Sequence, residues 1–348
     1  MPIFGNKAAG AQYKIRCGAY AVILDDAMRV AVIYTPGGYF LPGGGIEEGE
    51  TSEQALHREV MEECGMTLRI LQPIGSATDH LYAPPENCYY EKRGSFYLGQ
   101  FIEANADGDA PPFVWLETDT RAPDQPFRQE GHAWAATRGI QIASAELIVT
   151  LALSMYQKLG RPIIVAIDGG SGSGKSSYSV LLQDHAAVVG IPLDDFYTTQ
   201  IAEHEWPEIE LPRRLELVFD WQRIRRDVLI PLRSGMPGRW QPFDFTAGIG
   251  HDGKYALQKE FKVSGPAPII VLEGAYSASA ALSDLVDLAV LVNVPEAERH
   301  RRKLKRDGQA FADKWHAIWD PLEEYYFGRM RPASSFDLVV KNPTFRFR

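Results

Sequence analysis

The sequence predicts an α/β protein of two domains, the second of them built on a doubly wound parallel sheet. The chain has 348 residues, which is long for a single domain. An apolar run at 163–167, a segment rich in Gly and Ser at 169–176 and a helical pattern at 177–182 follow one another. This is the order of a strand, a phosphate-binding loop and a helix. Further strand and helix patterns follow it, as a parallel sheet requires.

Composition and charge are those of an ordinary globular protein with acidic character. Hydrophobic residues make up 45% and charged residues 23%. Of the net charge of −9, residues 1–158 carry −8, since they hold 12 Lys+Arg and 20 Asp+Glu. This acidity argues against a non-specific nucleic-acid surface. It suits phosphate substrates only if metal ions supply positive charge locally.

Targeting signals are not recognisable in the sequence. We find no apolar run long enough to cross a bilayer, and residues 1–12 lack the apolar stretch of a signal peptide. Cys17, Cys64 and Cys88 have no metal-type spacing. We therefore expect reduced thiols in a cytoplasmic protein that binds no membrane. A homo-oligomer is compatible with the sequence.

The first half begins with β-type patterns and continues with a well-delimited helix. Residues 14–24 and 29–34 are predicted strands. Thr51 can cap a helix, Gln54 can complete a capping box, and Cys64-Gly65 can end it. Further strands are expected at 87–101 and 111–116, and the last helix of this half is expected to open at 129–135.

Three carboxylates on the capped helix carry the chemistry of this half. Glu59, Glu62 and Glu63 are spaced i, i+3 and i+4, so they share one face, where like charges repel. A divalent cation would turn this repulsion into a binding site, because Mg²⁺ favours carboxylate oxygens. Arg58 can orient one carboxylate. The alternative is a solvated acidic helix face, which is common.

The residues around these carboxylates resemble the box of the Nudix hydrolases. The matching positions are Gly44, Glu50, Arg58, Glu59, Val60, Glu62, Glu63, Gly65 and Met66. Met66 stands where a branched aliphatic residue is more usual. The resemblance implies an α/β/α sandwich that hydrolyses a nucleoside diphosphate linked to a further group X. It also implies that Glu59, Glu62 and Glu63 bind Mg²⁺, with Mn²⁺ as a substitute, and that Arg58 and Glu50 brace the loop and helix. Two or more such ions can clamp a diphosphate and activate water.

The general base of this half is left open by the sequence. Glu130 or Glu117 could serve from outside the box, but an exposed Glu near a loop is an equally good interpretation. His132 is more often a capping or packing residue than a ligand. The aromatic residues of 89–97 are mostly expected in the core, although one ring could stack on a base.

A helical pattern at 144–158 ends at 160–162 and introduces the second domain. We therefore expect domains at 1–139 and 140–348. In the second, the loop backbone is expected to cradle phosphates, Lys175 to reach the outer phosphates and Ser176 to hold Mg²⁺. A flexible turn is the alternative. The expected ATP-binding residues of the loop are Gly169, Gly170, Ser171, Gly172, Ser173, Gly174, Lys175, Ser176 and Ser177.

Two further carboxylates are predicted at the ends of strands. The strand at 186–192 leads to Asp194, and the strand at 269–273 ends in Glu273. A doubly wound sheet places its chemistry at such ends. A helix is expected at 220–230, with Pro231 marking or kinking its end.

Strands are also expected at 285–294 and 336–340, on either side of a basic helix at 298–306. Arg299, Arg302 and Arg306 share one edge of this helix, which suits phosphates. The alternative is a solvated basic face.

The second half resembles the uridine kinase and phosphoribulokinase branch of P-loop kinases. The motifs that carry the resemblance are at 170–176, 193–197, 241–245, 272–274 and 299–307. The resemblance implies that Asp194 accepts the proton of the acceptor hydroxyl, that Glu273 lies near the metal or acceptor, and that the arginines form a lid over the phosphates of ATP. Phe243 and Gly248 stand where uridine kinases usually carry Tyr and His, which puts uridine specificity in doubt.

These patterns lead to a hypothesis of a bifunctional enzyme. One half would hydrolyse a nucleoside diphosphate-type bond, and the other would phosphorylate a small hydroxylated acceptor, preferably a nucleoside, from ATP. The alternative is a kinase of a non-nucleoside metabolite that a Nudix domain regulates as a ligand sensor. No nucleic-acid partner is expected.

Overall fold

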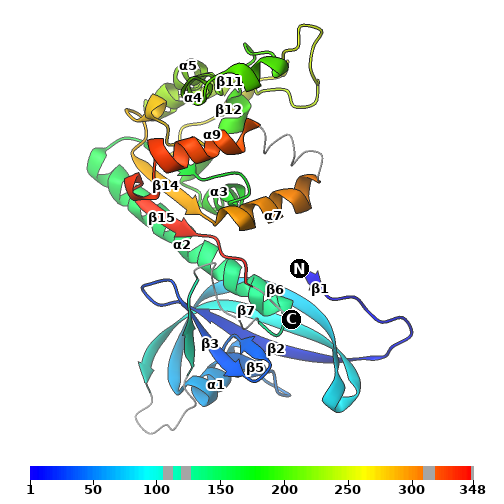
Figure 1. Ribbon diagram of the computed structural model, residues 1–348. Coiled ribbons are helices and arrows are strands. Elements are labelled where there is room, and N and C mark those ends of the chain that lie inside the picture. The colour runs from blue at the N-terminus through cyan, green and yellow to red at the C-terminus, as the bar shows by residue number, and fades with distance from the viewer. Residues whose placement is uncertain (105–112, 119–126, 309–317, 346–348) are drawn as a thin grey trace. The chain divides into compact units, whose positions relative to one another are not determined.

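The computed structural model describes residues 1–348 except 105–112, 119–126, 309–317 and 346–348 (Figure 1). It consists of two compact units. The first comprises Met1–Ala143 together with Pro343–Arg348, and the second comprises Ser144–Asn342. The division between Ala143 and Ser144 falls inside a helix, as does the boundary that the sequence suggests between residues 139 and 140.

The first unit is built from two small sheets and one capped helix. One sheet has the strand order β1-β6-β7-β2-β5 and the other β4-β3-β8. Their strands are β1 (Ile3–Phe4), β2 (Tyr13–Ile23), β3 (Val30–Thr35), β4 (Gly38–Phe40), β5 (Gly43–Gly45), β6 (Met66–Ala83), β7 (Cys88–Ala104) and β8 (Val114–Leu116). Of the strand expected at 111–116, residues 111 and 112 lie outside the described residues.

Strand β6 was not anticipated from the sequence, although it is one of the longest elements of the unit. It pairs with β7 antiparallel, with shifts of register between Met66 and Leu68, between Ile70 and Gln72, and between Pro73 and Gly75. Each shift turns the following side chains to the other face. The alternation of apolar and polar residues that reveals a strand is therefore interrupted.

Helix α1 (Ser52–Cys64) begins and ends as its sequence indicates. The Gln54 amide donates to Thr51 Oγ1 at 3.2 Å, and the Thr51 amide donates to Gln54 Oε1 at 2.9 Å, which completes the capping box. Gly65 closes the helix with φ 62°, a conformation that glycine adopts without strain. The apolar face of α1, with Leu56 and Val60, is buried, and Glu59 and Glu63 are partly buried beside it.

Helix α2 (Glu130–Leu159) is continuous where the sequence suggests two helical segments. Its first part, including Ala136 and Ile140, packs into the core of the first unit. Its second part, including Ile148 and Ala152, packs into the core of the second. From the sequence we found no apolar run long enough to cross a membrane, and this expectation needs correction. By length and composition alone, α2 is long and apolar enough to cross one. Half of its most apolar window is buried, and core helices meet the same criteria.

The second unit contains a parallel sheet with the strand order β10-β13-β9-β14-β15. The strands are β9 (Ile163–Asp168), β10 (Val188–Pro192), β13 (Ile269–Glu273), β14 (Leu288–Asn293) and β15 (Leu338–Lys341). Every residue of β9 is buried, as in a parallel sheet covered on both faces. The fold class predicted from the sequence is confirmed.

The remaining elements surround this sheet and contain one departure from the sequence pattern. The helices are α3 (Lys175–Gln183), α4 (Leu211–Leu217), α5 (Trp221–Ile224), α6 (Ile230–Arg233), α7 (Glu296–Asp307) and α9 (Asp320–Tyr325), and β11 (Gly238–Trp240) pairs with β12 (Lys262–Ser264). The helix expected to end near Pro231 runs on to Arg233. A π-helical turn at Arg225–Leu229 precedes Pro231, and such a widened turn accommodates a residue that has no N–H to donate.

We predict that two neighbouring residues of α2 differ in their contribution to stability. Ile148 is fully buried, whereas Leu147 is 46% exposed. Ile148→Ala should lower the free energy of unfolding by about 2–5 kcal/mol, and Leu147→Ala by less than about 0.5 kcal/mol. Urea unfolding measures both. A larger loss for Leu147→Ala would mean that the buried face of α2 is wrongly assigned.

Candidate functional site

In the first unit, Glu63 is the most deeply placed of the three carboxylates. The Gly43 amide donates to Glu63 Oε2 at 3.0 Å, which ties the end of α1 to the loop that precedes it. Burial raises the pKa of Glu63 to about 7, and the neighbouring charges of Glu59 and Glu62 act in the same direction. The carboxyl group therefore carries a proton more readily than a solvent-exposed one, until a positive charge is brought near it.

Arg58 connects this carboxylate cluster to the preceding loop. Its Nε lies 2.8 Å from Glu50 Oε1, its Nη2 2.9 Å from Glu50 Oε2, and its Nη1 3.0 Å from Glu59 Oε1. A fork of this kind fixes two carboxylates by geometry as well as by charge. The guanidinium holds the pKa of Glu50 at about 2. Glu62, whose side chain is 60% exposed, lies 3.5 Å from Arg58 Nη1 and extends into solvent.

Gly44 leaves the space that Glu59 occupies. A Cβ atom at this position would lie 2.4 Å from Glu59 Cδ, which is closer than atoms can approach. At Gly45 the same atom would meet nothing within 4 Å. The first of these two glycines is thus required by the placement of a carboxylate, and not by the turn alone.

The residues fit a hard divalent cation, although they are not gathered into a finished metal site. Among the described residues, no three His, Cys, Asp or Glu side chains already lie close enough to hold a metal ion. Glu59, Glu62 and Glu63 nevertheless share one face of α1, and the charges of Glu59 and Glu62 add to the effect of burial in raising the pKa of Glu63. Oxygen donors of this charge are those that Mg²⁺ prefers.

The candidates for a general base occupy different environments. Glu117 has a side chain that is 62% exposed and lies 3.7 Å from Arg29. Glu130 is the first residue of α2. His132 is 1% exposed, and burial lowers its pKa to about 3, so it is neutral and unsuited to accept a proton. The packing role expected for His132 is observed, since its ring lies against Tyr20 at 4.3 Å between centroids.

In the second unit, the buried Asp168 holds the phosphate-binding loop in place. It ends β9 and is 0% exposed. Its carboxylate accepts hydrogen bonds from the amides of Gly169 at 2.7 Å, Tyr276 at 2.8 Å and Ala278 at 3.0 Å. It also accepts one from the Tyr326 hydroxyl at 2.9 Å. Nothing in its sequence position distinguished this residue, because an Asp before a glycine-rich loop also fits a simple turn.

Three residues that the sequence predicts to bind phosphate or metal, Lys175, Ser176 and Glu273, lie around the phosphate-binding loop. Lys175 Nζ donates to the Gly169 carbonyl at 2.7 Å and to the Gly170 carbonyl at 3.3 Å. The Ser176 hydroxyl donates to Glu273 Oε1 at 3.4 Å. Parallel pairing of β13 with β9 places Glu273 beside the end of the loop strand. Burial raises the pKa of Glu273, and Lys175 opposes that shift.

Asp194 follows β10, the neighbour of β13 in the sheet. Asp194 is exposed to solvent, and desolvation by the surrounding protein nevertheless raises the pKa of its carboxyl. Lys175 and Arg306 act in the opposite direction. Asp194 and Glu273 influence each other electrostatically, so the structure brings together the two carboxylates that the sequence placed at strand ends.

The arginines of α7 differ in their surroundings. Arg299 Nη1 lies 2.6 Å from Glu323 Oε2, and the other oxygen of Glu323 accepts the Ser171 amide at 2.8 Å. Arg302 donates to the carbonyls of Gly172 and Ser173, each at 3.3 Å. These two arginines therefore hold the backbone of the loop, Arg299 through Glu323 and Arg302 directly. Arg306 is exposed.

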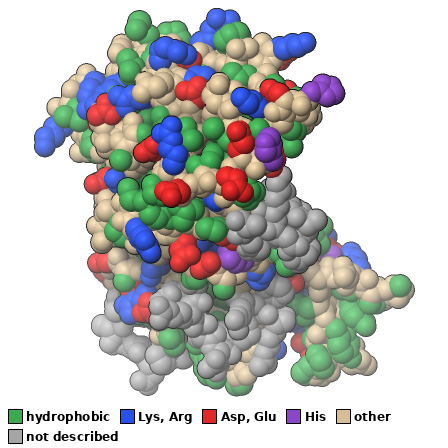
Figure 2. Space-filling view, turned by 45° about the horizontal axis from the view of Figure 1, so that its top comes forward, with side chains coloured by type: hydrophobic (Ala, Val, Ile, Leu, Met, Phe, Trp, Pro, Cys, Tyr) green, Lys and Arg blue, Asp and Glu red, His purple; other side chains and the backbone are tan. Residues whose placement is uncertain are grey.

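Charged side chains of both signs are present on the surface. On the face shown in Figure 2, the described Lys and Arg side chains are mixed with Asp and Glu. No large area of positive sign is visible there among the described residues.

Comparisons with known proteins assign the two halves to families. The family model of the NUDIX domain matches residues 14–124. A uridine kinase of Listeria innocua is 30% identical over 193 residues, which are 52% of this chain and 87% of the relative. A uridine kinase of Alkaliphilus metalliredigens is 26% identical over 181 residues, which are 50% of this chain and 80% of the relative.

The chain belongs to the uridine kinase family. It also carries a NUDIX domain in its first half. The protein is therefore an enzyme with a hydrolase domain and a kinase domain, as the sequence predicts. Proteins of both types generally use a divalent metal, and kinases use ATP.

Solved structures similar to each half are known. A NUDIX hydrolase from Nitrosomonas europaea is 23% identical, with a TM-score of 0.25, and the match covers 30% of this chain and 74% of that one. A possible uridine kinase from Bacillus stearothermophilus is 17% identical, with a TM-score of 0.35, over 51% of this chain and 88% of that one.

Two residues of the kinase domain were missed from the sequence and found in the structure, namely Asp168 and Glu323. Glu323 is 2% exposed and joins the loop to α7 through Ser171 and Arg299. It stands beside a second glutamate, Glu324, which is exposed. The sequence gives no means of telling the two apart, because α9 is too short for a clear helical period.

We predict that Gly44→Ala weakens Mg²⁺ binding by the NUDIX domain, because its methyl group would displace the carboxylate of Glu59. Gly45→Ala is the matched control and should bind the ion as the parent protein does. Isothermal titration calorimetry measures the affinity. Equal affinities for the two variants would show that the position of Glu59 does not matter for the ion.

We predict that Glu323 and Arg299 of the kinase domain act as one pair. Glu323→Gln and Arg299→Gln should each destabilise the kinase domain by about 3 kcal/mol, the cost of leaving one partner of a buried pair alone. The double variant should lose less than the sum. Urea unfolding gives these values, with Glu324→Gln as the control that changes stability by less than about 0.5 kcal/mol. Strict additivity would contradict the pairing.

Proposed function

We propose that the protein is a bifunctional enzyme whose two domains act on different bonds. The NUDIX domain would hydrolyse the diphosphate bond of a nucleoside diphosphate linked to a group X. The kinase domain would transfer the terminal phosphoryl group of ATP to a small hydroxylated acceptor, preferably a nucleoside. The observation that carries this proposal is the presence of two separate sets of carboxylates, each beside a loop fixed through its own backbone amides.

The hydrolase proposal assigns metal binding to Glu59, Glu62 and Glu63. A bound Mg²⁺, or Mn²⁺ in its place, would neutralise the diphosphate and activate water. Arg58 would keep Glu59 in position while it remains paired with Glu50. The Gly43 amide would keep Glu63 turned toward the same site.

The kinase proposal gives each residue around the loop a distinct task. The backbone from 169 to 177 would surround the phosphates of ATP, and Lys175 would exchange its loop carbonyls for phosphate oxygens. Ser176 and Glu273 would hold the metal ion. Asp194 would accept the proton of the attacking hydroxyl, and its raised pKa suits a base of this kind.

The three arginines of α7 have two different roles in this proposal. Arg306 lies near Asp194 electrostatically and is exposed, so it would reach the transferred phosphate. Arg299 and Arg302 would act on ATP through the loop that they hold. A donor that is already in place when charge develops contributes most to the rate.

The identity of the acceptor depends on residues that depart from the uridine kinase pattern. Phe243 is 5% exposed and packs against Tyr197 at 5.6 Å and Phe245 at 4.8 Å between ring centroids. It can stack on a ring but offers no hydroxyl to a sugar. Gly248 offers no side chain at all. The site would therefore accept a flat or apolar acceptor more broadly than one that reads polar groups.

A second candidate function is that the NUDIX domain binds a ligand without cleaving it and regulates the kinase domain. The three carboxylates on α1 speak against it, because a domain that only binds a ligand does not need them. The acceptor of the kinase would then be a non-nucleoside metabolite. A ligand that changes the kinase rate and is never hydrolysed in the presence of Mg²⁺ would favour this alternative.

We predict that substitutions separate the two activities. Glu62→Gln and Glu63→Gln should abolish Mg²⁺-dependent hydrolysis in a panel of nucleoside diphosphate derivatives and leave phosphorylation of nucleosides from ATP intact. Lys175→Ala and Asp194→Asn should have the reverse effect, with a loss of phosphorylation of about 100-fold or more. Hydrolysis is measured by the release of its phosphate-containing products, and phosphorylation by the consumption of ATP. Both are measured on the same preparation of each variant.

The outcome that contradicts this proposal is a shared loss. If one substitution silences both reactions while circular dichroism and the melting temperature stay unchanged, the two sets of carboxylates do not serve separate reactions.

A further inference from the structure

Asp195 follows the proposed proton acceptor Asp194 in the chain but differs from it in its surroundings. Both residues lie in the short 3₁₀-helical turn Leu193–Phe196 after β10. Asp194 is exposed, whereas Asp195 is 7% exposed. The proposed phosphoryl transfer gives the side chain of Asp195 no task. A buried carboxylate requires hydrogen-bond donors or a counter-charge, and those of Asp195 come from a distant part of the chain.

The carboxylate of Asp195 is bound by both strands of the hairpin that β11 and β12 form (Figure 1). Trp240 Nε1 donates to its Oδ2 at 2.8 Å, and Lys262 Nζ donates to both oxygens, each at 2.9 Å. Trp240 is the last residue of β11 and Lys262 the first of β12, and the two are paired across the hairpin. One side chain therefore holds the two strands where they lie opposite each other.

The backbone carbonyl of Asp195 holds the segment 241–245, which continues from β11. This carbonyl accepts the Phe243 amide at 2.8 Å and Arg223 Nη2 at 3.1 Å. Arg223 Nη1 in turn donates to the Gln241 carbonyl. The hairpin is thus attached to Asp195 twice, once through the carboxylate and once through the main chain.

The attached segment lies against the residues next to Asp194. Phe243 packs against Tyr197 with 5.6 Å between ring centroids, and Phe245 lies 5.9 Å from the same ring. Burial raises the pKa of Tyr197, and the charge of Asp194 adds to this shift, so the phenol lies in the field of that carboxylate. Phe245 is 60% exposed. An acceptor whose hydroxyl lies at Asp194 would find these rings beside it.

Stability alone gives little reason for an ion pair at this place. The side chain of Lys262 is 48% exposed, and pairs open to solvent contribute little. Trp240 and Phe196 already stack here with 5.9 Å between their centroids. What the carboxylate adds to this apolar packing is direction, because a hydrogen bond fixes which atoms meet. Strands of three residues, such as β11 and β12, need such a constraint, since a short hairpin by itself is marginally stable in water.

We infer that Asp195 is a positioning residue of the kinase domain, which holds the hairpin and the segment 241–245 beside Asp194 before the acceptor binds. This inference rests on the proposed function, because the site that it positions is that of the acceptor. Without the Lys262 ammonium group, a larger fraction of molecules would have the hairpin released. The apparent affinity for the acceptor falls in proportion to the fraction that remains competent to bind.

Hydrogen–deuterium exchange of the full-length protein without nucleotide tests the attachment of the hairpin. We expect Lys262→Met to increase exchange of the peptide that covers residues 238–245. Lys262→Arg should restore the protection, because a guanidinium group can also donate to both oxygens of a carboxylate. The control is Lys259→Met, which removes the same charge from an exposed position three residues earlier and should change nothing.

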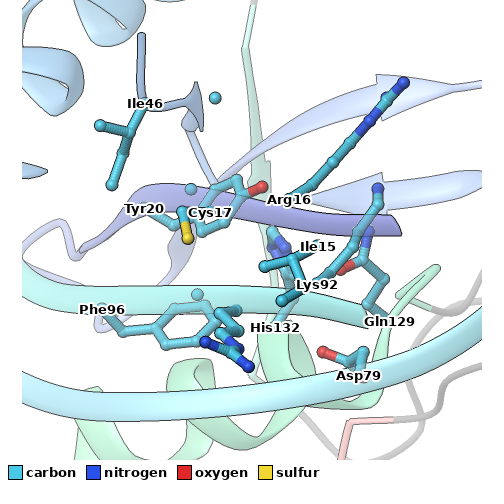
Figure 3. Close-up of a pocket in the computed structure, with 14 residues that line it drawn as sticks. Ile15, Arg16, Cys17, Tyr20, Ile46, Asp79, Lys92, Phe96, Gln129 and His132 are labelled. Atoms are coloured by element: carbon cyan, nitrogen blue, oxygen red, sulfur yellow. The ribbon is translucent and has the colours of Figure 1, made fainter. Parts of the chain in front are cut away.

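Two other peptides of the same protein serve as references. One covers the phosphate-binding loop at 169–177. The other covers 129–135 in the NUDIX domain, where Gln129 and His132 line a cavity (Figure 3). Exchange of both should remain as in the parent protein. A similar increase in all three peptides would indicate general destabilisation, which contradicts a positioning role.

Steady-state kinetics with ATP, Mg²⁺ and uridine test the role of the hairpin in the reaction. Lys262→Met should raise the KM for uridine about tenfold, because less of the protein is competent to bind it. The kcat and the KM for ATP should stay within about twofold of the parent values, since saturating uridine selects the attached hairpin. A merely structural role would lower the melting temperature without separating the two KM values.

Unchanged exchange of the hairpin peptide in Lys262→Met, or an equal rise of both KM values, would overturn the inference and leave the kinase proposal in place. Asp195→Ala should produce the same changes, and Lys262→Met decides the matter if that variant fails to fold. If the parent protein phosphorylates no nucleoside, the proposed acceptor class is wrong. The exchange experiment then decides by itself whether Asp195 holds the hairpin.

Discussion

Carboxylates that accept hydrogen bonds from backbone amides hold the loops at both candidate sites of this protein. Asp168 receives amides from the start of the phosphate-binding loop and from the segment after β13. Glu63 receives the Gly43 amide, and Glu323 receives the Ser171 amide. A hydrogen bond from a neutral amide to a charged acceptor is stronger than one between neutral groups. Loops rich in glycine can thereby keep a single shape despite their intrinsic freedom.

The same arrangement would hold the charges of the proposed phosphate site in place. Lys175 is retained by carbonyls of its own loop, and Arg302 by carbonyls of the following residues. These hydrogen bonds satisfy both cations, and in the proposed kinase reaction only Lys175 would exchange its carbonyls for phosphate oxygens. Little reorganisation is then needed when a nucleotide arrives, which is the condition for efficient electrostatic stabilisation.

Sequence patterns predicted those features that depend on local spacing. Thr51, Gln54 and Gly65 delimited α1, and the loop from 169 to 176 indicated a parallel sheet. Features that depend on long-range contact were not predictable. The role of Glu323 arises from Arg299 and Ser171, which are 24 and 152 positions away. The interrupted register of β6 hid an entire strand.

The first unit includes residues from the far end of the chain. Phe345 packs against Phe127 with 5.3 Å between ring centroids and is 8% exposed, and the Thr137 hydroxyl donates to the Pro343 carbonyl at 3.3 Å. In terms of chain order, the kinase domain is an insertion within the hydrolase domain. During synthesis on the ribosome, the hydrolase core therefore receives the ring of Phe345 only after the kinase domain has been translated. A fragment truncated after the kinase would lose that ring and leave Phe127 uncovered.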